Sequence, residues 1–247
     1  MEVGFKTDKG LRRSNNEDAC YVLKKDKVFI VADGVGGNNS GEIASRTCVD
    51  EIAKYVETHD LTLCETDEDI EAYFAECIKD VNFKILELSQ RHEENWGMAT
   101  TVVVACLKDN QLYVFNVGDS RAYILRNHTL TQITEDHTYV NSLVKAGVIT
   151  AEEAETHENR NMITRAIGAD YKIDADAFVI TVEAGDRILL CTDGLYGEIN
   201  HDELCAQLAE DVSMTEICDA FVDAAKSNGG NDNITMIVVN VTEEDIK

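Results

Sequence analysis

Residues 28–37 read VFIVADGVGG, an apolar run that ends in an aspartate followed by three glycines within four positions. The β-branched part from Val28 to Ala32 predicts a buried strand. Glycine permits a sharp backbone turn directly after it. The stretch therefore predicts that Asp33 is a carboxylate held with little freedom at the end of a buried strand.

Four other segments carry acidic residues beside predicted strands. They are YVFNVGDSR with Asp119, RILLCTDGLYG with Asp193, GGNDNIT with Asp232, and RRSNNEDAC with Glu17 and Asp18. A single Asp-Gly pair is more often a hairpin turn than a site. Repetition of the pattern favours carboxylates that converge at one rim of a sheet, where burial needs compensating cations. Oxygen ligands favour Mg²⁺, Mn²⁺ or Ca²⁺ over zinc.

The apolar periodicity predicts a mixed α+β chain. Strands are predicted at 21–23, 28–32, 101–107, 112–117, 121–125, 177–182, 187–191 and 234–241, and helical stripes at 43–56, 70–88 and 217–224. Capping boxes at Thr150 with Glu153 and at Ser213 with Glu216 predict two helix starts. Connections between the strands of 101–125 are too short for helical crossovers, so these strands are expected to pair antiparallel. We predict two antiparallel sheets packed face to face with helices outside.

The composition excludes several classes of partner. The net charge is -25, from 47 acidic against 22 basic residues. Such a surface argues against nucleic acid and against an anionic membrane. The first residues lack the apolar core of a signal peptide, and no apolar run approaches ~20 residues. We therefore expect a single cytoplasmic domain over 1–247.

One alternative site is a phosphate cradle for a nucleotide. Residues 33–37 are rich in glycine and precede a predicted helix, whose amino end could bind an anion. The segment lacks the spacing of a P-loop or of a dinucleotide fingerprint. This alternative is therefore weaker than the carboxylate site.

The ordered motifs resemble those of the metal-dependent, type 2C Ser/Thr protein phosphatases. The similar segments are RSNNED at 13–18, VADGVGG at 31–37, GDSR at 118–121, CTDGL at 191–195 and GNDNIT at 230–235. The resemblance spans almost the whole chain and is closest to compact bacterial members. It implies a four-layer αββα fold, in which a central sandwich of two antiparallel β-sheets is flanked by helix pairs.

The resemblance also implies a centre for two, or with a further site three, Mn²⁺ or Mg²⁺ ions. The implied metal ligands are Asp18, Asp33, the carbonyl of Gly34, Asp119, Asp193 and Asp232, with Glu17 and Asn233 behind them. Asp33 would bridge two ions and so act in catalysis. Arg13 would hold the phosphate oxygens with its planar fork, which lysine cannot copy. Two ions close together ready a water for attack on phosphorus.

Two features of the resemblance leave roles open. Many members have a histidine after the first Asp-Gly or after the following Gly-Gly, where this chain has Val35 and Asn38. The general acid is therefore unassigned, with His137 or a metal-bound water as hypotheses. Residues 138–160 are expected to form two short helices, which in the family make a flap over the site.

The predicted function is hydrolysis of phosphoserine and phosphothreonine in proteins, opposing a bacterial Ser/Thr kinase. The predicted partners are phosphorylated proteins and that kinase, and the chain is expected to be monomeric. Two alternatives stay open at this point. One is a binding module that has kept the fold without the chemistry, which loss of ligand aspartates would signal. The other is a phosphatase for small phosphate esters.

Overall fold

A computed structural model describes residues 1–36, 40–91 and 93–246. Its strands form two antiparallel sheets. One sheet has the order β1 (Glu2–Asp8), β11 (Ile234–Asn240), β10 (Arg187–Cys191), β7 (Arg121–Arg126) and β8 (Thr129–Gln132). The other has the order β2 (Asp18–Leu23), β3 (Val28–Val35), β5 (Val102–Lys108), β6 (Gln111–Val117) and β9 (Asp176–Thr181), with β4 (Ala99–Thr100) beside β3.

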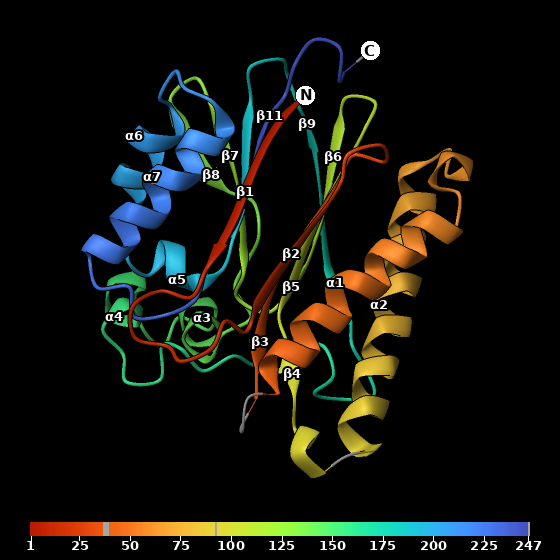
Figure 1. The fold of residues 1–247 in the computed structure, drawn as a ribbon, viewed down its shortest axis with the longest axis vertical. Helices are drawn as coiled ribbons and strands as arrows, with labels where there is room; N and C mark the ends of the chain where they lie inside the picture. The colour runs from red at the N-terminus through yellow and green to blue at the C-terminus, as the bar shows by residue number, and fades with distance from the viewer. Residues whose placement is uncertain (37–39, 92, 247) are drawn as a thin grey trace.

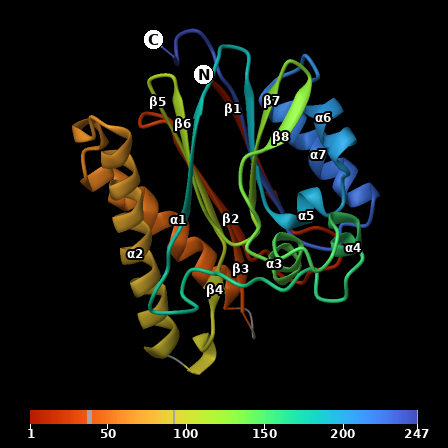
Figure 2. The same ribbon diagram turned by 180° about the vertical axis from the view of Figure 1, so that it is seen from behind.

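The two sheets lie face to face between two layers of helices (Figure 1). Helices α1 (Gly41–Thr58) and α2 (Asp67–Arg91) cover the sheet that contains β3, and α6 (His201–Leu208) and α7 (Met214–Ser227) cover the sheet that contains β10. A third apolar cluster, with Phe29, Leu190 and Ile237, fills the space between the sheets. The predicted four-layer αββα sandwich is confirmed, and it is seen from behind in Figure 2.

The pairing predicted for strands 101–125 is correct for one pair and wrong for the other. Strands β5 and β6 pair antiparallel, from Val102 opposite Val117. Strand β7 instead leaves that sheet and pairs with β10 and β8. The chain crosses between the sheets at Gly118, whose φ of 107° suits glycine alone. A short connection excludes a helical crossover but does not require the two strands to share a sheet.

Some elements have weak sequence signals. Strand β1 is an edge strand whose Phe5 is exposed, so it lacks an apolar stripe. Its Gly4 lies under α7, since an added Cβ would stand 2.1 Å from the Met214 carbonyl oxygen. Strand β8 has four residues, and α6 buries two leucines. The three predicted helices and both capping boxes are confirmed.

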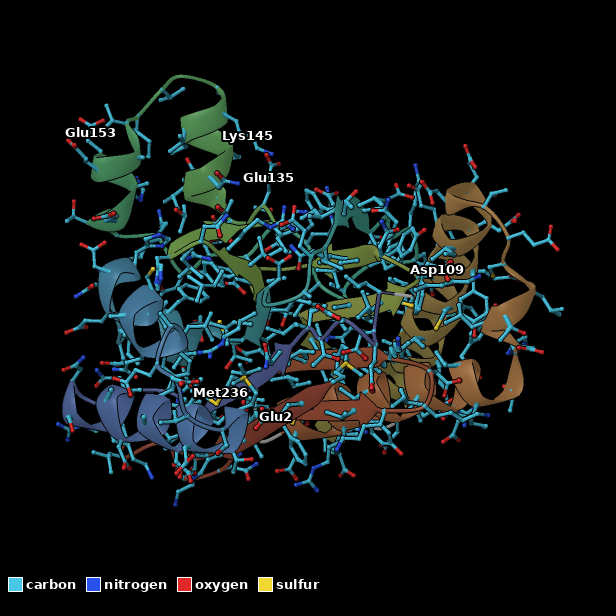
Figure 3. All side chains as sticks on the ribbon, turned by 90° about the horizontal axis from the view of Figure 1, so that it is seen from above. Glu2, Asp109, Glu135, Lys145, Glu153 and Met236 are labelled. Carbon is cyan, nitrogen blue, oxygen red and sulfur yellow. The ribbon has the colours of Figure 1, made fainter. Side chains whose placement is uncertain are left out.

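Residues 138–160 form two short helices, α3 (Tyr139–Lys145) and α4 (Ala151–Glu155), as predicted. Thr138 caps α3 and Thr150 caps α4. Figure 3 shows both helices standing out from the sandwich, with Lys145 beside Glu135, its ion-pair partner. Within the described residues, no helix is both long enough and apolar enough to cross a membrane.

Candidate metal centre

Asp33 and Asp18 lie opposite each other on neighbouring strands, β3 and β2. The Asp33 main chain is fixed by Thr101, whose Oγ1 accepts its N–H at 3.0 Å and whose N–H donates to its carbonyl at 2.9 Å. Asp18 accepts a hydrogen bond from Thr192 Oγ1 at 2.9 Å. Because Thr192 follows β10, this bond joins the two sheets and brings Asp18 and Asp33 to the β10 end.

Asp193 and Asp232 are placed by two turns that touch. Asp193 follows β10, Asp232 precedes β11, and these strands are paired. A Cβ added to Gly194 would stand 2.0 Å from the Asn233 carbonyl oxygen and 3.2 Å from the Asp232 Cβ. Only glycine fits this contact, so the second Asp-Gly pair is a packing requirement between two predicted ligand loops.

Gly34 and Glu17 lie on one side of this cluster. The Gly34 N–H donates to the Glu17 carbonyl at 3.0 Å, and an added Cβ would stand 2.0 Å from the Gly41 carbonyl oxygen. Asn233 Oδ1 accepts the Glu17 N–H at 2.8 Å, and its Nδ2 donates to the Asn15 carbonyl at 2.9 Å. Asn233 thus fastens the 15–17 loop to the Asp232 turn, as suits a residue predicted to stand behind the ligands.

Asp119 lies in the crossing between the sheets. Its carbonyl accepts a hydrogen bond from the Tyr196 hydroxyl at 3.0 Å. The preceding Gly118 donates its N–H to His137 Nδ1 at 3.0 Å, and its carbonyl accepts the main-chain N–H of His137 at 2.9 Å. His137 Nε2 lies 3.1 Å from an Asp176 carboxylate oxygen. Since both ring nitrogens face protein groups, His137 fixes the loop and lends no support to a role as general acid.

Burial raises the pKa values of the carboxylates at this end. The pKa of Asp18 and that of Asp119 rise to about 7, and that of Asp193 rises to about 6. The pKa of Asp33 also lies well above its usual range. After burial, the main cause is repulsion among neighbouring aspartates, Asp232 included. The structure thus brings the five predicted aspartates within reach of one another's charge.

These side chains fit a hard divalent cation. Asp18 Oδ1 and Asp193 Oδ1 are buried and have no hydrogen-bond partner among the described residues. An orphaned buried carboxylate oxygen is costly unless a cation binds it. No three His, Cys, Asp or Glu side chains in the described ranges form a ready-made ion site.

A groove of about 1140 Å³ opens beside the aspartates. Its lining includes Asp119, Asp193 and Asp232, together with Val140 and Arg160 from the 138–160 segment. The two short helices of that segment thus form one wall of the groove, and α5 (Asp193–Tyr196) and α6 contribute to another.

Arg13 and the hypotheses for a general acid have different outcomes. The Arg13 Nη2 lies 2.6 Å from Asp232 Oδ2, and the arginine side chain is half exposed. This places its guanidinium at the edge of the aspartate cluster. Val35 ends β3 and has no acid–base group. Asn38 lies outside the described residues.

Sequence reasoning missed several supporting residues. Arg121, Asp136 and Tyr196 form a partly buried contact beside Asp119. Arg121 and Tyr196 lie within the segments that carry Asp119 and Asp193, so the motif letters could have indicated them. Asp136 has no sequence signal, since it stands in a polar loop and reaches Arg121 only through the fold.

Comparison with known proteins agrees with this arrangement. A family model described as Protein phosphatase 2C matches residues 11–236. The Serine/threonine phosphatase stp of Listeria monocytogenes serotype 4b (strain F2365) is 39% identical over 97% of this chain and 95% of its own length. The Protein phosphatase PhpP of Streptococcus pneumoniae (strain ATCC BAA-255 / R6) is 37% identical over 99% of both chains.

Solved structures resemble this chain in both fold and sequence. The Ser/Thr phosphatase Stp1 from Staphylococcus aureus superposes with a TM-score of 0.91 at 35% identity, covering 98% of this chain and 95% of that one. The catalytic domain of PstP, solved in complex with two manganese ions, superposes with a TM-score of 0.85 at 32% identity over 98% of each chain. The chain therefore belongs to the protein phosphatase 2C family.

Proposed function

We propose that this protein hydrolyses phosphoserine and phosphothreonine in proteins with the help of Mn²⁺ or Mg²⁺. The observation that carries the proposal is the gathering of Asp18, Asp33, Asp119, Asp193 and Asp232 from separate strand ends, with oxygens left orphaned. A relative at 39% identity bears the name of a Ser/Thr phosphatase, and another, at 32% identity, was solved with two manganese ions.

Each aspartate has a proposed role. Asp33 would be shared by two ions, Asp193 and Asp232 would help to hold one of them, and the Gly34 carbonyl with Asp18 would help to hold the other. Glu17 and Asn233 stand behind these ligands, and Asp119 with Asp193 would serve a third ion. When bound, the ions supply an activated water for attack on phosphorus. The aspartates of this chain would hold the ions in place.

Arg13 is the proposed phosphate-binding residue. Its planar guanidinium can donate two parallel hydrogen bonds to phosphate oxygens. Here it bonds to Asp232, while half of its side chain faces solvent. If Asp232 held a cation instead, Arg13 would be free to donate to the phosphate. No described side chain is assigned as the acid that protonates the leaving alkoxide.

The proposal extends to how the protein works in a cell. Residues 1–247 act as one phosphatase domain, and the 138–160 segment acts as a flap that contacts the substrate protein over the groove. The enzyme would be a monomer in the bacterial cytoplasm and would reverse the signalling of a cognate Ser/Thr kinase. Support comes from the groove wall that α3 and α4 form and from the bacterial relatives.

The test is phosphate release with and without Mn²⁺ from p-nitrophenyl phosphate, a phosphothreonine peptide and free phosphoserine. We expect turnover only with the metal, and a higher kcat/KM for the peptide than for free phosphoserine. Asp33→Asn and Asp232→Asn should lose that turnover. Metal-independent activity that both variants retain would disprove the proposal, and equal efficiency on free phosphoserine would point to a phosphatase for small esters.

A further inference from the structure

Arg121 stands two residues after Asp119, and both side chains line the groove. The Arg121 guanidinium pairs with Asp136, and its Nη1 also donates to the Tyr123 hydroxyl at 3.0 Å. Its Nε donates to Asp136 Oδ1 at 3.0 Å, and its Nη2 donates to Asp136 Oδ2 at 2.6 Å. The centroid of the Tyr196 ring lies 3.6 Å from the guanidinium carbon. The guanidinium therefore stacks on Tyr196 with its flat face while its N–H groups bond to Asp136.

Asp136 is itself held from two sides. Gln132 Nε2 donates to its Oδ1 at 3.0 Å from the end of β8. Asn141 Nδ2, on α3, donates to its carbonyl at 2.7 Å. The Asp136 side chain is only 14% exposed. The position that Arg121 occupies is therefore set by the edge of one sheet and by the 138–160 segment together.

Arg13 shows what an unrestrained arginine does at this site. Among the described residues its side chain bonds only to Asp232, with Nη2 at 2.6 Å from Oδ2, and it is 50% exposed. A cluster of buried carboxylates attracts a nearby guanidinium strongly. The positive charge offsets both the repulsion among the carboxylates and the desolvation cost of burying them. Arg121 lies near enough for its charge to act on Asp119, yet it pairs elsewhere.

We propose that Asp136 is a positioning residue that holds Arg121 away from Asp119 and so keeps the Asp119 carboxylate open to a divalent cation. The proposal rests on the proposed function, because it concerns the site of the third ion. An arginine paired with Asp119 would have to be displaced before a cation could bind there. Asp136 prevents that competition by offering Arg121 two charge-assisted hydrogen bonds.

The test is calorimetric titration of the metal-free protein with Mn²⁺. Asp136→Asn keeps the shape of the side chain but removes the charge that retains Arg121. We expect the Kd of the weakest Mn²⁺ step to rise about tenfold, the scale of losses behind a metal site, with the tighter steps unchanged. Arg121→Gln removes the competitor, so it should bind Mn²⁺ at least as well as the wild type.

The double variant Arg121→Gln with Asp136→Asn should regain the weakest step that Asp136→Asn loses. A merely structural role for the pair predicts the opposite, since both single variants would then weaken binding alike and the double variant would recover nothing. The matched control is Asp186→Asn, which breaks the bidentate pair of Asp186 with Arg126 at the other end of β7. It should leave every Mn²⁺ step unchanged.

The outcomes separate this inference from the proposed function. Asp136→Asn that binds Mn²⁺ like Asp186→Asn, or a wild-type protein with only two Mn²⁺ steps and full turnover, overturns the inference alone. A wild-type protein that binds no Mn²⁺ and releases no phosphate overturns the proposed function as well. Melting curves for each variant show whether a lost step reflects the site or the fold.

Discussion

The two ends of the sandwich treat buried aspartates differently. At the end away from the groove, Asp186 is 2% exposed and bonds to Arg126 through both carboxylate oxygens, at 2.9 and 2.6 Å. Asp245 lies 3.0 Å from the N-terminal amine of Met1 and also bonds to Thr242. At the groove end, Asp18 is 5% exposed and one of its oxygens has no described partner.

The contrast is sharpest along β10, because Asp186 precedes this strand and Asp193 follows it. Burial of a carboxylate is unfavourable at either end. At one end cations of the chain itself offset it, and hydrogen bonds from Thr242 and the amino terminus bring the pKa of Asp245 below its usual range despite burial. At the other end burial raises the pKa of Asp193 to about 6. The groove end therefore lacks positive charge beside its buried carboxylates, and divalent ions would supply it.

The largest effect is expected at the centre of the groove end. Asp33→Asn should lower kcat/KM on a phosphothreonine peptide at least about a hundredfold, because even changes behind a metal site cost about 10- to 100-fold. Asp186→Asn should leave kcat/KM within error of the wild type. Near-full activity of folded Asp33→Asn would break the comparison between the two ends.

Stability should depend on pH and metal at the groove end. The pKa values of Asp18 and Asp119 are about 7 in the folded protein, against about 3.9 for an unperturbed aspartate. Raised pKa values contribute stability in acid that is lost as pH rises through about 7. The Tm of the metal-free protein should therefore fall between pH 6 and pH 8.

Mn²⁺ should reverse that fall, because cations replace the protons on these carboxylates. A free concentration of 100 times Kd adds about 2.7 kcal/mol for each site. Protons compete for the same carboxylates at pH 6, so at one fixed Mn²⁺ concentration the Tm gain should be larger at pH 8 than at pH 6. Calorimetric melting at both pH values measures it. A metal-free Tm that rises over this range would contradict the assignment of unpaired charge to this end.

A moderate effect is expected at the rim of the groove. Arg13→Lys should raise the KM for a phosphopeptide about tenfold, because a point charge cannot reproduce a bidentate fork. Steady-state kinetics with Arg12→Lys as the neighbouring control would measure it, since Arg12 is also exposed and directly precedes Arg13. Equal KM values for the two variants would remove Arg13 from phosphate binding.

The smallest effect on activity should come from the end away from the groove. Asp186→Asn removes the bidentate partner of Arg126, leaves it only Glu183 at 3.7 Å, and should lower the unfolding free energy by about 1–3 kcal/mol. Urea unfolding measures that loss, and kinetics on the same sample should show unchanged kcat. A large loss of kcat in protein that is still folded would mean that the two ends are coupled.

Much of the fold was predictable because its signals are local. The runs that became β3, β5, β6 and β10 are apolar enough to specify buried strands, and the stripe of α2 is long. Edge strands such as β1 and β8 were missed because exposure removes the apolar pattern. The sheet of β7 was assigned wrongly, since strand partners depend on contacts between residues far apart in the chain.

The sequence alone determined which chemistry is possible at the site. Its aspartates beside glycines at strand ends, its Arg13 and its motif order specify oxygen ligands and the family, because side-chain chemistry and local turns are encoded locally. Only the tertiary structure decided which carboxylates lie together and which arginine is held apart from them. Thr192 reaches Asp18 across 174 residues, and Asp136 holds Arg121 through a loop without a motif. Such contacts arise from how the sheets pack, which short stretches of sequence do not record.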